Sequence, residues 1–239
     1  MAETIMILDT VRFLLGVIIL TYASYTDIKT RRASNINWLI MGVAGGILLL
    51  IQYITVGFEN PYYLIFIPIM IGFVYVLFQL RLLFGGADAK ALMAIAILVP
   101  FEPAISQLPI WKGSLMPFSW SIFANSIILF LFIPLSLLIL NLRKRNIKFP
   151  YCLLGYKMSI NKAREKFIWP LEKIKDGKRK FMYMPKDFDV EDELDEFEKL
   201  GIKETWVTPK IPFMIPLLAG FIFAFIIGDI LFAIMNLFI

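Results

Sequence analysis

Long apolar runs separated by short polar connections dominate the pattern of this chain. A helix needs about 20 mostly apolar residues to cross the hydrocarbon core of a bilayer. The run at 89–101 is shorter than the others and ends at Pro100, so by length alone it could also be a re-entrant segment. The pattern therefore predicts six membrane-spanning helices, at residues 6–25, 36–57, 61–80, 89–101, 119–140 and 212–238.

Basic residues in the connections orient these spans. By the positive-inside rule, short loops rich in Lys and Arg face the cytoplasm. All the basic loops share one side only if 89–101 crosses the membrane. We therefore predict a multi-pass cell membrane protein with six crossings and both termini outside. The basic loops hold Lys29, Arg31 and Arg32; Arg81 and Lys90; and Arg143, Lys144, Arg145 and Lys148.

The chain divides by polarity into three parts. Residues 1–140 form a membrane domain with five transmembrane helices, and residues 211–239 form the sixth helix. Between them lies a cytoplasmic soluble insert at 141–210, which accounts for the whole formal net charge of +5. The fold class we expect is an α-helical integral membrane protein with a small cytoplasmic α/β insert before the last helix.

Two elements are predicted inside the insert. The tract 187–201 is typical of an acidic amphipathic helix, because Leu194, Phe197 and Leu200 recur every three residues. Gly201 suits the C-terminal cap of this helix. The acidic face is either a solvated surface or an electrostatic attractant for a basic peptide. A short strand is predicted around Val207.

Composition narrows the chemistry further. The chain is 59% hydrophobic and 18% charged, with a mean hydropathy of +0.75. These values exclude a simple soluble domain, a disordered chain and a nucleic-acid-binding module as the class of the whole protein. It has no histidine and one cysteine, Cys152, so Ser-His and Cys-His pairs, HExxH sites and cysteine zinc clusters are excluded. Nucleotide-binding glycine motifs are absent as well. Any acid–base chemistry must use carboxylates, lysines or tyrosines.

Two aspartates are the candidate catalytic groups. Asp27 ends the first span and Asp88 begins the fourth, so two crossings return the chain to the same membrane face. Ionisable groups at membrane depth are costly and indicate function. Two adjacent carboxylates share one proton, so one can deprotonate a water while the other polarises a carbonyl. Such a pair hydrolyses acyl bonds without a cofactor or metal.

The neighbours of Asp88 suit such a site. Gly85, Gly86 and Ala87 precede it and leave the backbone accessible to an extended peptide. Lys90 follows, as a snorkelling anchor or a group that tunes the charge of Asp88. These four residues are the predicted site-shaping positions.

Two short segments resemble a known family. Asp27 followed by Arg31-Arg32 and Asn35 resembles the first aspartate motif of type IV prepilin peptidases, and we expect Asn35 to cap the second span. Gly85-Gly86-Ala87-Asp88-Ala89-Lys90 resembles their GxGD motif, with Ala87 in place of the second glycine. The archaeal branch, the preflagellin peptidases, is more similar: it has six spans, an insert before the last, and a Thr-Pro-x-Ile-Pro-Phe segment like residues 208–213.

This resemblance implies a GxGD-type membrane aspartyl protease with Asp27 and Asp88 as catalytic residues. Its substrate would be the short basic leader of a preflagellin or prepilin-like subunit, cut at the cytoplasmic face. The implied partners are this substrate and the lipid bilayer, with no nucleic acid and no nucleotide. The bifunctional bacterial enzymes carry a cysteine-rich zinc insert, and one cysteine cannot build it, so we expect no methyltransferase activity.

Several alternatives remain open at this point. Asp27 and Asp88 could be ordinary helix-end residues, and Ser24 with Lys90 could form a Ser-Lys pair. A proton-coupled transporter also uses intramembrane carboxylates, but with acidic residues near the midplane and with repeated halves. A non-catalytic assembly subunit would bind partners through the insert. Elsewhere, Asp9 and Arg12 are expected to pair near the membrane surface, and Asp229 to hydrogen-bond between helices.

Overall fold

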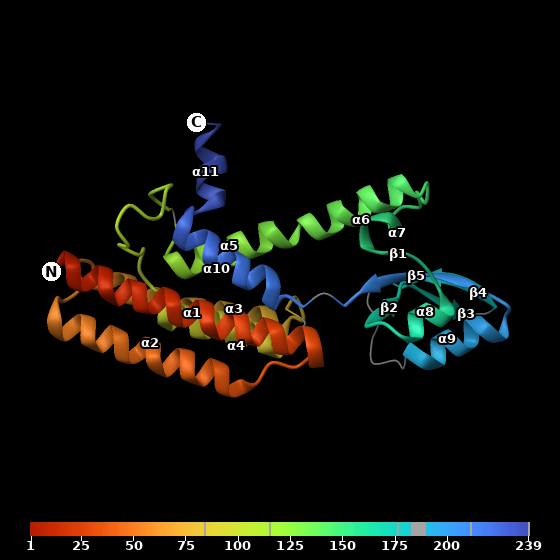
Figure 1. The fold of residues 1–239 in the computed structure, drawn as a ribbon, viewed down its shortest axis with the longest axis horizontal. Coiled ribbons are helices and arrows are strands. Elements are labelled where there is room, and N and C mark those ends of the chain that lie inside the picture. Colours follow the sequence, from red (N-terminus) through yellow and green to blue (C-terminus); the bar gives the residue numbers. More distant parts are fainter. Residues whose placement is uncertain (84, 115, 176, 183–189, 211, 239) are drawn as a thin grey trace. The chain divides into compact units, whose positions relative to one another are not determined.

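The computed structural model describes residues 1–83, 85–114, 116–175, 177–182, 190–210 and 212–238. The chain divides into two compact units, one of Met1–Phe130 with Pro212–Ile239, and one of Leu131–Ile211. Helices make up the first unit, and the second combines helices with short strands (Figure 1).

The helical unit consists of long helices joined by short connections. α1 ends because Arg31 adopts a left-handed conformation (φ 56°) and its N–H donates to the carbonyl of Asp27 at 2.9 Å. Gly45 of α2 packs closely on α4, since a Cβ there would lie 2.7 Å from the Cα of Leu98. The elements are α1 (Ala2–Thr30), α2 (Asn35–Thr55), the 3-10 helix η1 (Pro61–Ile65) leading into α3 (Phe66–Gln79), α4 (Gly86–Leu98), α5 (Phe118–Phe130), α10 (Met214–Ile226) and α11 (Ile230–Asn236).

The outer faces of these helices are apolar and their buried faces include polar groups. On α1, Leu14 and Ile18 are exposed, whereas Asp9 and Arg12 are buried. This is the reverse of a water-soluble protein and suits helices surrounded by lipid. Among the described residues, four helical segments are long and apolar enough to cross a membrane, or five if the bent pair α10 and α11 counts as one span.

α4 lies at the centre of the helical unit. Ala91, Ile95 and Ala96 are completely buried, and the helix contacts α2, α3 and α5. Its 13 residues extend for about 20 Å, which is less than the roughly 30 Å of a hydrocarbon core. The short run at 89–101 is therefore a helix covered mainly by other helices, and its length keeps it outside the candidate spans.

The last apolar run differs from the single helix predicted at 212–238. α10 and α11 meet at an angle of 58°, around Gly228 with its φ of 114°. The N–H groups of Ile110 and Trp111 donate to the carbonyls of Ile226 and Ile227, at 3.0 and 2.7 Å. These bonds from a distant loop satisfy carbonyls at the end of α10, so the helix can stop inside the apolar run.

The second unit holds the small sheet. β5 lies between β1 and β2 in an antiparallel sheet of three strands, while β3 and β4 form a separate hairpin. The elements are α6 (Phe132–Arg143), α7 (Tyr151–Leu154), β1 (Tyr156–Ser159), α8 (Ile160–Arg164), β2 (Ile168–Pro170), β3 (Glu172–Lys175), β4 (Lys178–Phe181), α9 (Val190–Lys199) and β5 (Glu204–Pro209).

The acidic helix and the strand predicted in this unit are present. α9 spans Val190–Lys199, and its Leu194 and Phe197 are completely buried; residues 187–189 of the predicted tract lie outside the described residues. Placing Leu200 on the same apolar face was wrong, because α9 ends before it and its side chain is 53% exposed. Gly201 ends the helix as expected, with a φ of 71° and its N–H on the carbonyl of Glu198.

Candidate active site

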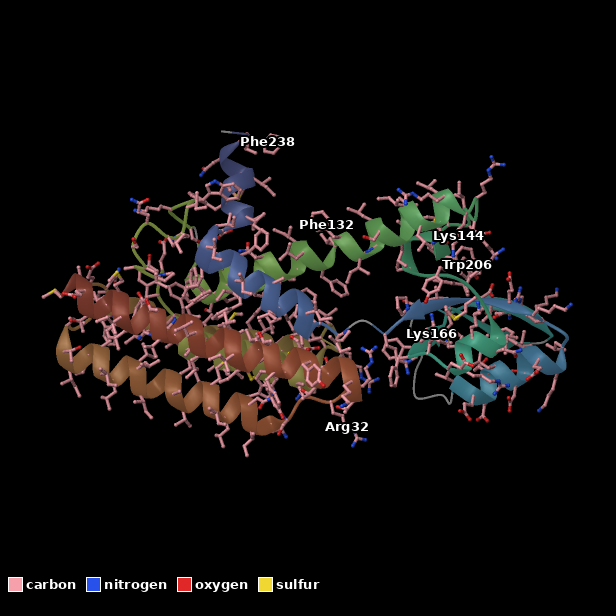
Figure 2. The ribbon with its side chains drawn as sticks, in the orientation of Figure 1. Arg32, Phe132, Lys144, Lys166, Trp206 and Phe238 are labelled. Carbon is pink, nitrogen blue, oxygen red and sulfur yellow. The ribbon has the colours of Figure 1, made fainter. Side chains whose placement is uncertain are left out.

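The end of α1 and the start of α4 bring the two candidate aspartates to one end of the helical unit. Asp27 lies in the last turn of α1, Asp88 lies in the first turn of α4, and the two helices are in contact. Both side chains are half-buried, and the charge of Asp27 acts on Asp88. Arg32, just beyond α1, marks this end of the unit in Figure 2. Carboxyls from distant parts of the sequence are thus close enough to interact.

Gly85 makes the closest approach to Asp88. It is the extended N-cap residue of α4 (φ −93°, ψ 115°), and a Cβ on it would overlap Oδ2 of Asp88. A Cβ on Gly86 would meet only the ring of Phe78, at 3.6 Å, which is an ordinary contact. Ala87 is half-buried in the first turn of the helix. These three predicted site-shaping residues therefore differ in how closely they approach the aspartate.

Lys90 joins α4 to the first motif. Its Nζ donates to Oδ1 of Asn35 at 2.8 Å. The expectation that Asn35 caps α2 was wrong: Ser34 is the cap residue, and its hydroxyl accepts from the N–H of Ile36 at 3.4 Å. The pair of Lys90 and Asn35 was not predicted from the sequence, although both residues belong to the recognised motifs and return to the same end of the helices.

Ser24 is not the partner of Lys90. Its hydroxyl is buried and donates to the carbonyl of Met214 at 3.1 Å, which ties α1 to the first residue of α10. With Lys90 bonded to Asn35, the described structure holds no Ser24–Lys90 pair.

A buried ion pair occupies the opposite end of α1. Nη1 of Arg12 contacts Oδ1 of Asp9 at 2.7 Å, as predicted, and Nη2 donates to Gln52 at 2.8 Å. Asp9 and Asp27 are about 27 Å apart along a straight helix. A cavity of about 310 Å³ lies at this end and is lined by Asp9, Arg12 and Gln52 among others, so the large cavity is remote from Asp27 and Asp88.

Asp229 also belongs to this opposite end. It caps α11 by accepting from the N–H of Phe232 at 3.0 Å, and it accepts from the hydroxyls of Ser114 and Ser121 at 2.7 and 2.8 Å. The prediction that Asp229 hydrogen-bonds between helices is confirmed. Within the described parts of the chain, no group of three or more His, Cys, Asp or Glu side chains is placed to hold a metal ion.

The fold is that of a helical membrane protein. Its candidate site consists of two carboxyls that influence each other at one end of the helices. The model of the type IV leader peptidase family matches residues 14–141, and that of the archaeal peptidase A24 C-terminus, type II, matches 147–230. The chain therefore belongs to the type IV leader peptidase family.

Curated relatives agree with this assignment over nearly the whole chain. The preflagellin peptidase of Methanococcus voltae is 27% identical over 234 residues, covering 92% of this chain and 96% of that protein. The preflagellin peptidase of Methanococcus maripaludis is 27% identical with the same coverage, and that of Methanocaldococcus jannaschii is 25% identical over 92% and 94%. These proteins match both the helical unit and the unit that contains the sheet.

Proposed function

We propose that this chain is an aspartic endopeptidase of the membrane that removes the short basic leader from preflagellin or prepilin-like subunits. Leader cleavage follows from the family, and the substrate class follows from the relatives that carry the preflagellin peptidase name. The proposal adds the catalytic residues, Asp27 and Asp88, and the side of the membrane at which they act.

The observation that carries the proposal is that the last turn of α1 and the first turn of α4 bring Asp27 and Asp88 to one end of the helical unit, near enough for the charge of Asp27 to act on Asp88. Two neighbouring carboxyls share one proton and titrate as a pair. The ionised member takes a proton from a water molecule, while the protonated member polarises the scissile carbonyl. Both side chains are half-buried, so a substrate can reach them while part of each remains shielded from solvent.

The surrounding residues support a peptide-cleaving site. The extended Gly85 next to Asp88 leaves room for a substrate backbone, since it has no side chain to cover the carboxyl. Lys90 and Asn35 link the helix that carries Asp88 to the start of α2 and so limit the movement of this end. In this proposal Gly85, Gly86, Ala87 and Lys90 shape the site and do not take part in the proton transfers.

We further propose six crossings, with the aspartates and the insert on the cytoplasmic side and both termini outside. α4 then crosses as a short helix that is shielded by α2, α3 and α5. Its shortness is compatible with crossing because the loop that follows it lines the cavity at the opposite end, and irregular backbone at membrane depth requires such a cavity or protein cover.

Replacing one aspartate at a time tests the proposed catalysis. The full chain in detergent is incubated with a synthetic peptide that has a basic leader followed by an apolar helix. Asp27→Asn and Asp88→Asn should each lower kcat by at least about a hundredfold, the usual contribution of a positioned acid or base. Asp192→Asn, an exposed aspartate on α9, should cleave at the wild-type rate. Full cleavage by either of the first two variants would exclude the proposed pair.

A further inference from the structure

A small polar pocket lies in the second unit, and neither Asp27 nor Asp88 is among its lining residues. It has a volume of about 230 Å³, and its ionisable lining residues are Lys148, Lys157, Arg179, Glu172 and Glu204. The remaining lining residues are Thr205 and Trp206 of β5. Cations exceed carboxylates by one charge, so the pocket is complementary to a single negative charge.

The buried carboxylate of Glu172 organises this pocket. Only 2% of its side chain is exposed, and Oε2 accepts from the hydroxyl of Thr205 at 3.1 Å and from the N–H of Trp206 at 3.4 Å. Lys148 and Arg179 lie near its two oxygens, at 4.0 and 3.7 Å. Thr205 and Trp206 thus hold the carboxylate of Glu172 from inside, and Lys148 and Arg179 pair with it from the pocket. The two cations are 60% and 41% exposed, so they remain accessible to a ligand.

Lys157 supplies the third positive charge. It is exposed on β1, and its Nζ lies 5.8 Å from the centre of the Trp206 ring. It forms no ion pair with any residue for which the structure gives a position. An anion in the pocket would give this lysine a partner.

The pocket lies in the same unit as the end of a candidate membrane span. The span Phe118–Arg143 ends with α6, and α6 contacts both α7 and β1. Asn141 near the end of α6 donates to the carbonyls of Cys152 and Gly155, at 3.0 and 2.6 Å. Figure 2 labels Lys144, just past α6, and Trp206 of the pocket. The end of the span and the pocket are thus held together in one compact unit.

The segment that follows α6 has the composition of a membrane interface. Leu142, Ile147 and Phe149 are 48%, 66% and 78% exposed. Exposed cations alternate with them: Arg143, Lys144, Arg145 and Lys148. Apolar side chains at such a position enter the headgroup region, while basic side chains attract anionic phosphates. Lys148 belongs both to this segment and to the pocket.

We propose that the pocket of Lys148, Lys157 and Arg179 binds the phosphodiester of an anionic membrane lipid. The residues 142–149 hold the pocket at the level of the headgroups, and one phosphodiester neutralises its excess positive charge. A free phosphate shares this chemistry, but it would make no use of the exposed apolar side chains beside the pocket. The lipid thereby fixes the sheet-containing unit to the bilayer surface, independently of whether Asp27 and Asp88 are catalytic.

Native mass spectrometry of the full chain in detergent tests this proposal. The added ligands are dihexanoylphosphatidylglycerol, dihexanoylphosphatidylcholine and inorganic phosphate. One phosphatidylglycerol should bind per chain, and Lys157→Gln should weaken its binding about fivefold, the effect of one basic residue at an anionic surface. Lys162→Gln, which removes an exposed lysine of α8 outside the pocket, should bind as the wild type does.

Three results would overturn the proposal. Equal binding of phosphatidylglycerol and phosphatidylcholine would show that the acyl chains, and not the charge of the headgroup, determine binding. Equal effects of Lys157→Gln and Lys162→Gln on phosphatidylglycerol binding would exclude the pocket as the binding site. Inorganic phosphate that binds as tightly as the lipid would identify a site for free phosphate instead. None of these measurements depends on leader cleavage.

Discussion

At the scale of single residues, the candidate site depends on one missing side chain. Gly85 lies so close to Asp88 that a Cβ would overlap the carboxyl, whereas Gly86 has room for a methyl group beside Phe78. Steric overlap therefore explains why the first residue of the motif is glycine, but it does not explain the second glycine. Ala87, where the strict motif has glycine, is accommodated in the first turn of α4.

We predict that Gly85→Ala lowers the rate of leader cleavage at least about tenfold, because the methyl group displaces the carboxyl of Asp88, and small misplacements of a catalytic group have large costs. The measurement is kcat on the synthetic leader peptide, together with the melting temperature of each protein. Gly46→Ala is the matched control, since a Cβ there has open space around it. Wild-type kcat in Gly85→Ala would show that Asp88 does not need its present position.

At the scale of elements, α9 shows how burial of one charged residue affects a helix. Its apolar side chains Leu194 and Phe197 pack into the second unit, and Glu193 is drawn into a half-buried position beside them. Burial raises the pKa of the Glu193 carboxyl above its usual range, and the charges of Glu196 and Asp192 raise it further, against an opposing effect of Lys173. The helix is therefore held less firmly when Glu193 is ionised.

The pH dependence follows from this direction. Between the usual glutamate pKa and the raised pKa in the fold, the folded chain binds more protons than the unfolded chain, so stability falls as the pH rises through that interval. We predict that Glu193→Gln removes this pH-dependent loss of stability, so that the amides of α9 are better protected from exchange at neutral pH than in the wild type. The measurement is hydrogen exchange of the α9 amides, corrected for intrinsic exchange rates. Glu191→Gln, at an exposed position of the same helix, is the control. Equal protection in wild type and Glu193→Gln would contradict the predicted effect.

At the scale of the whole molecule, the two ends of the helical unit have different chemistry. One end carries Asp27, Asp88 and the bond between Lys90 and Asn35. The other end carries the buried pair of Asp9 and Arg12 and the cavity. The proposed orientation assigns the first end to the cytoplasm and the second to the outside.

Cysteine labelling tests this orientation. Single cysteines replace exposed residues in a Cys152→Ser chain, since Cys152 is the one natural cysteine and is buried. In intact cells, an impermeant maleimide should label Glu59→Cys, while Arg32→Cys and Arg81→Cys should react only after permeabilisation. Retained leader cleavage confirms that each variant is folded. Labelling of Arg32→Cys in intact cells would reverse the orientation.

The sequence by itself determined where most of the helices lie, the return of both aspartates to one end, and the acidic helix of the insert. These features depend on apolar run length, on the number of crossings between two residues and on helical periodicity, all of which are local or additive along the chain. The pairing of Asp9 with Arg12 was predictable for the same reason, because three residues form one helical turn.

Only the tertiary structure decided which distant groups meet. The partner of Lys90 and the break between α10 and α11 arise from segments far apart in sequence, and the overlap of a Cβ at Gly85 with the Asp88 carboxyl depends on the conformation of this turn. The pocket around Glu172 likewise combines residues of β1, β3, β4 and β5 with Lys148. Hydropathy predicts which segments are removed from water. The contacts that a buried segment makes depend on how the helices and strands pack against one another.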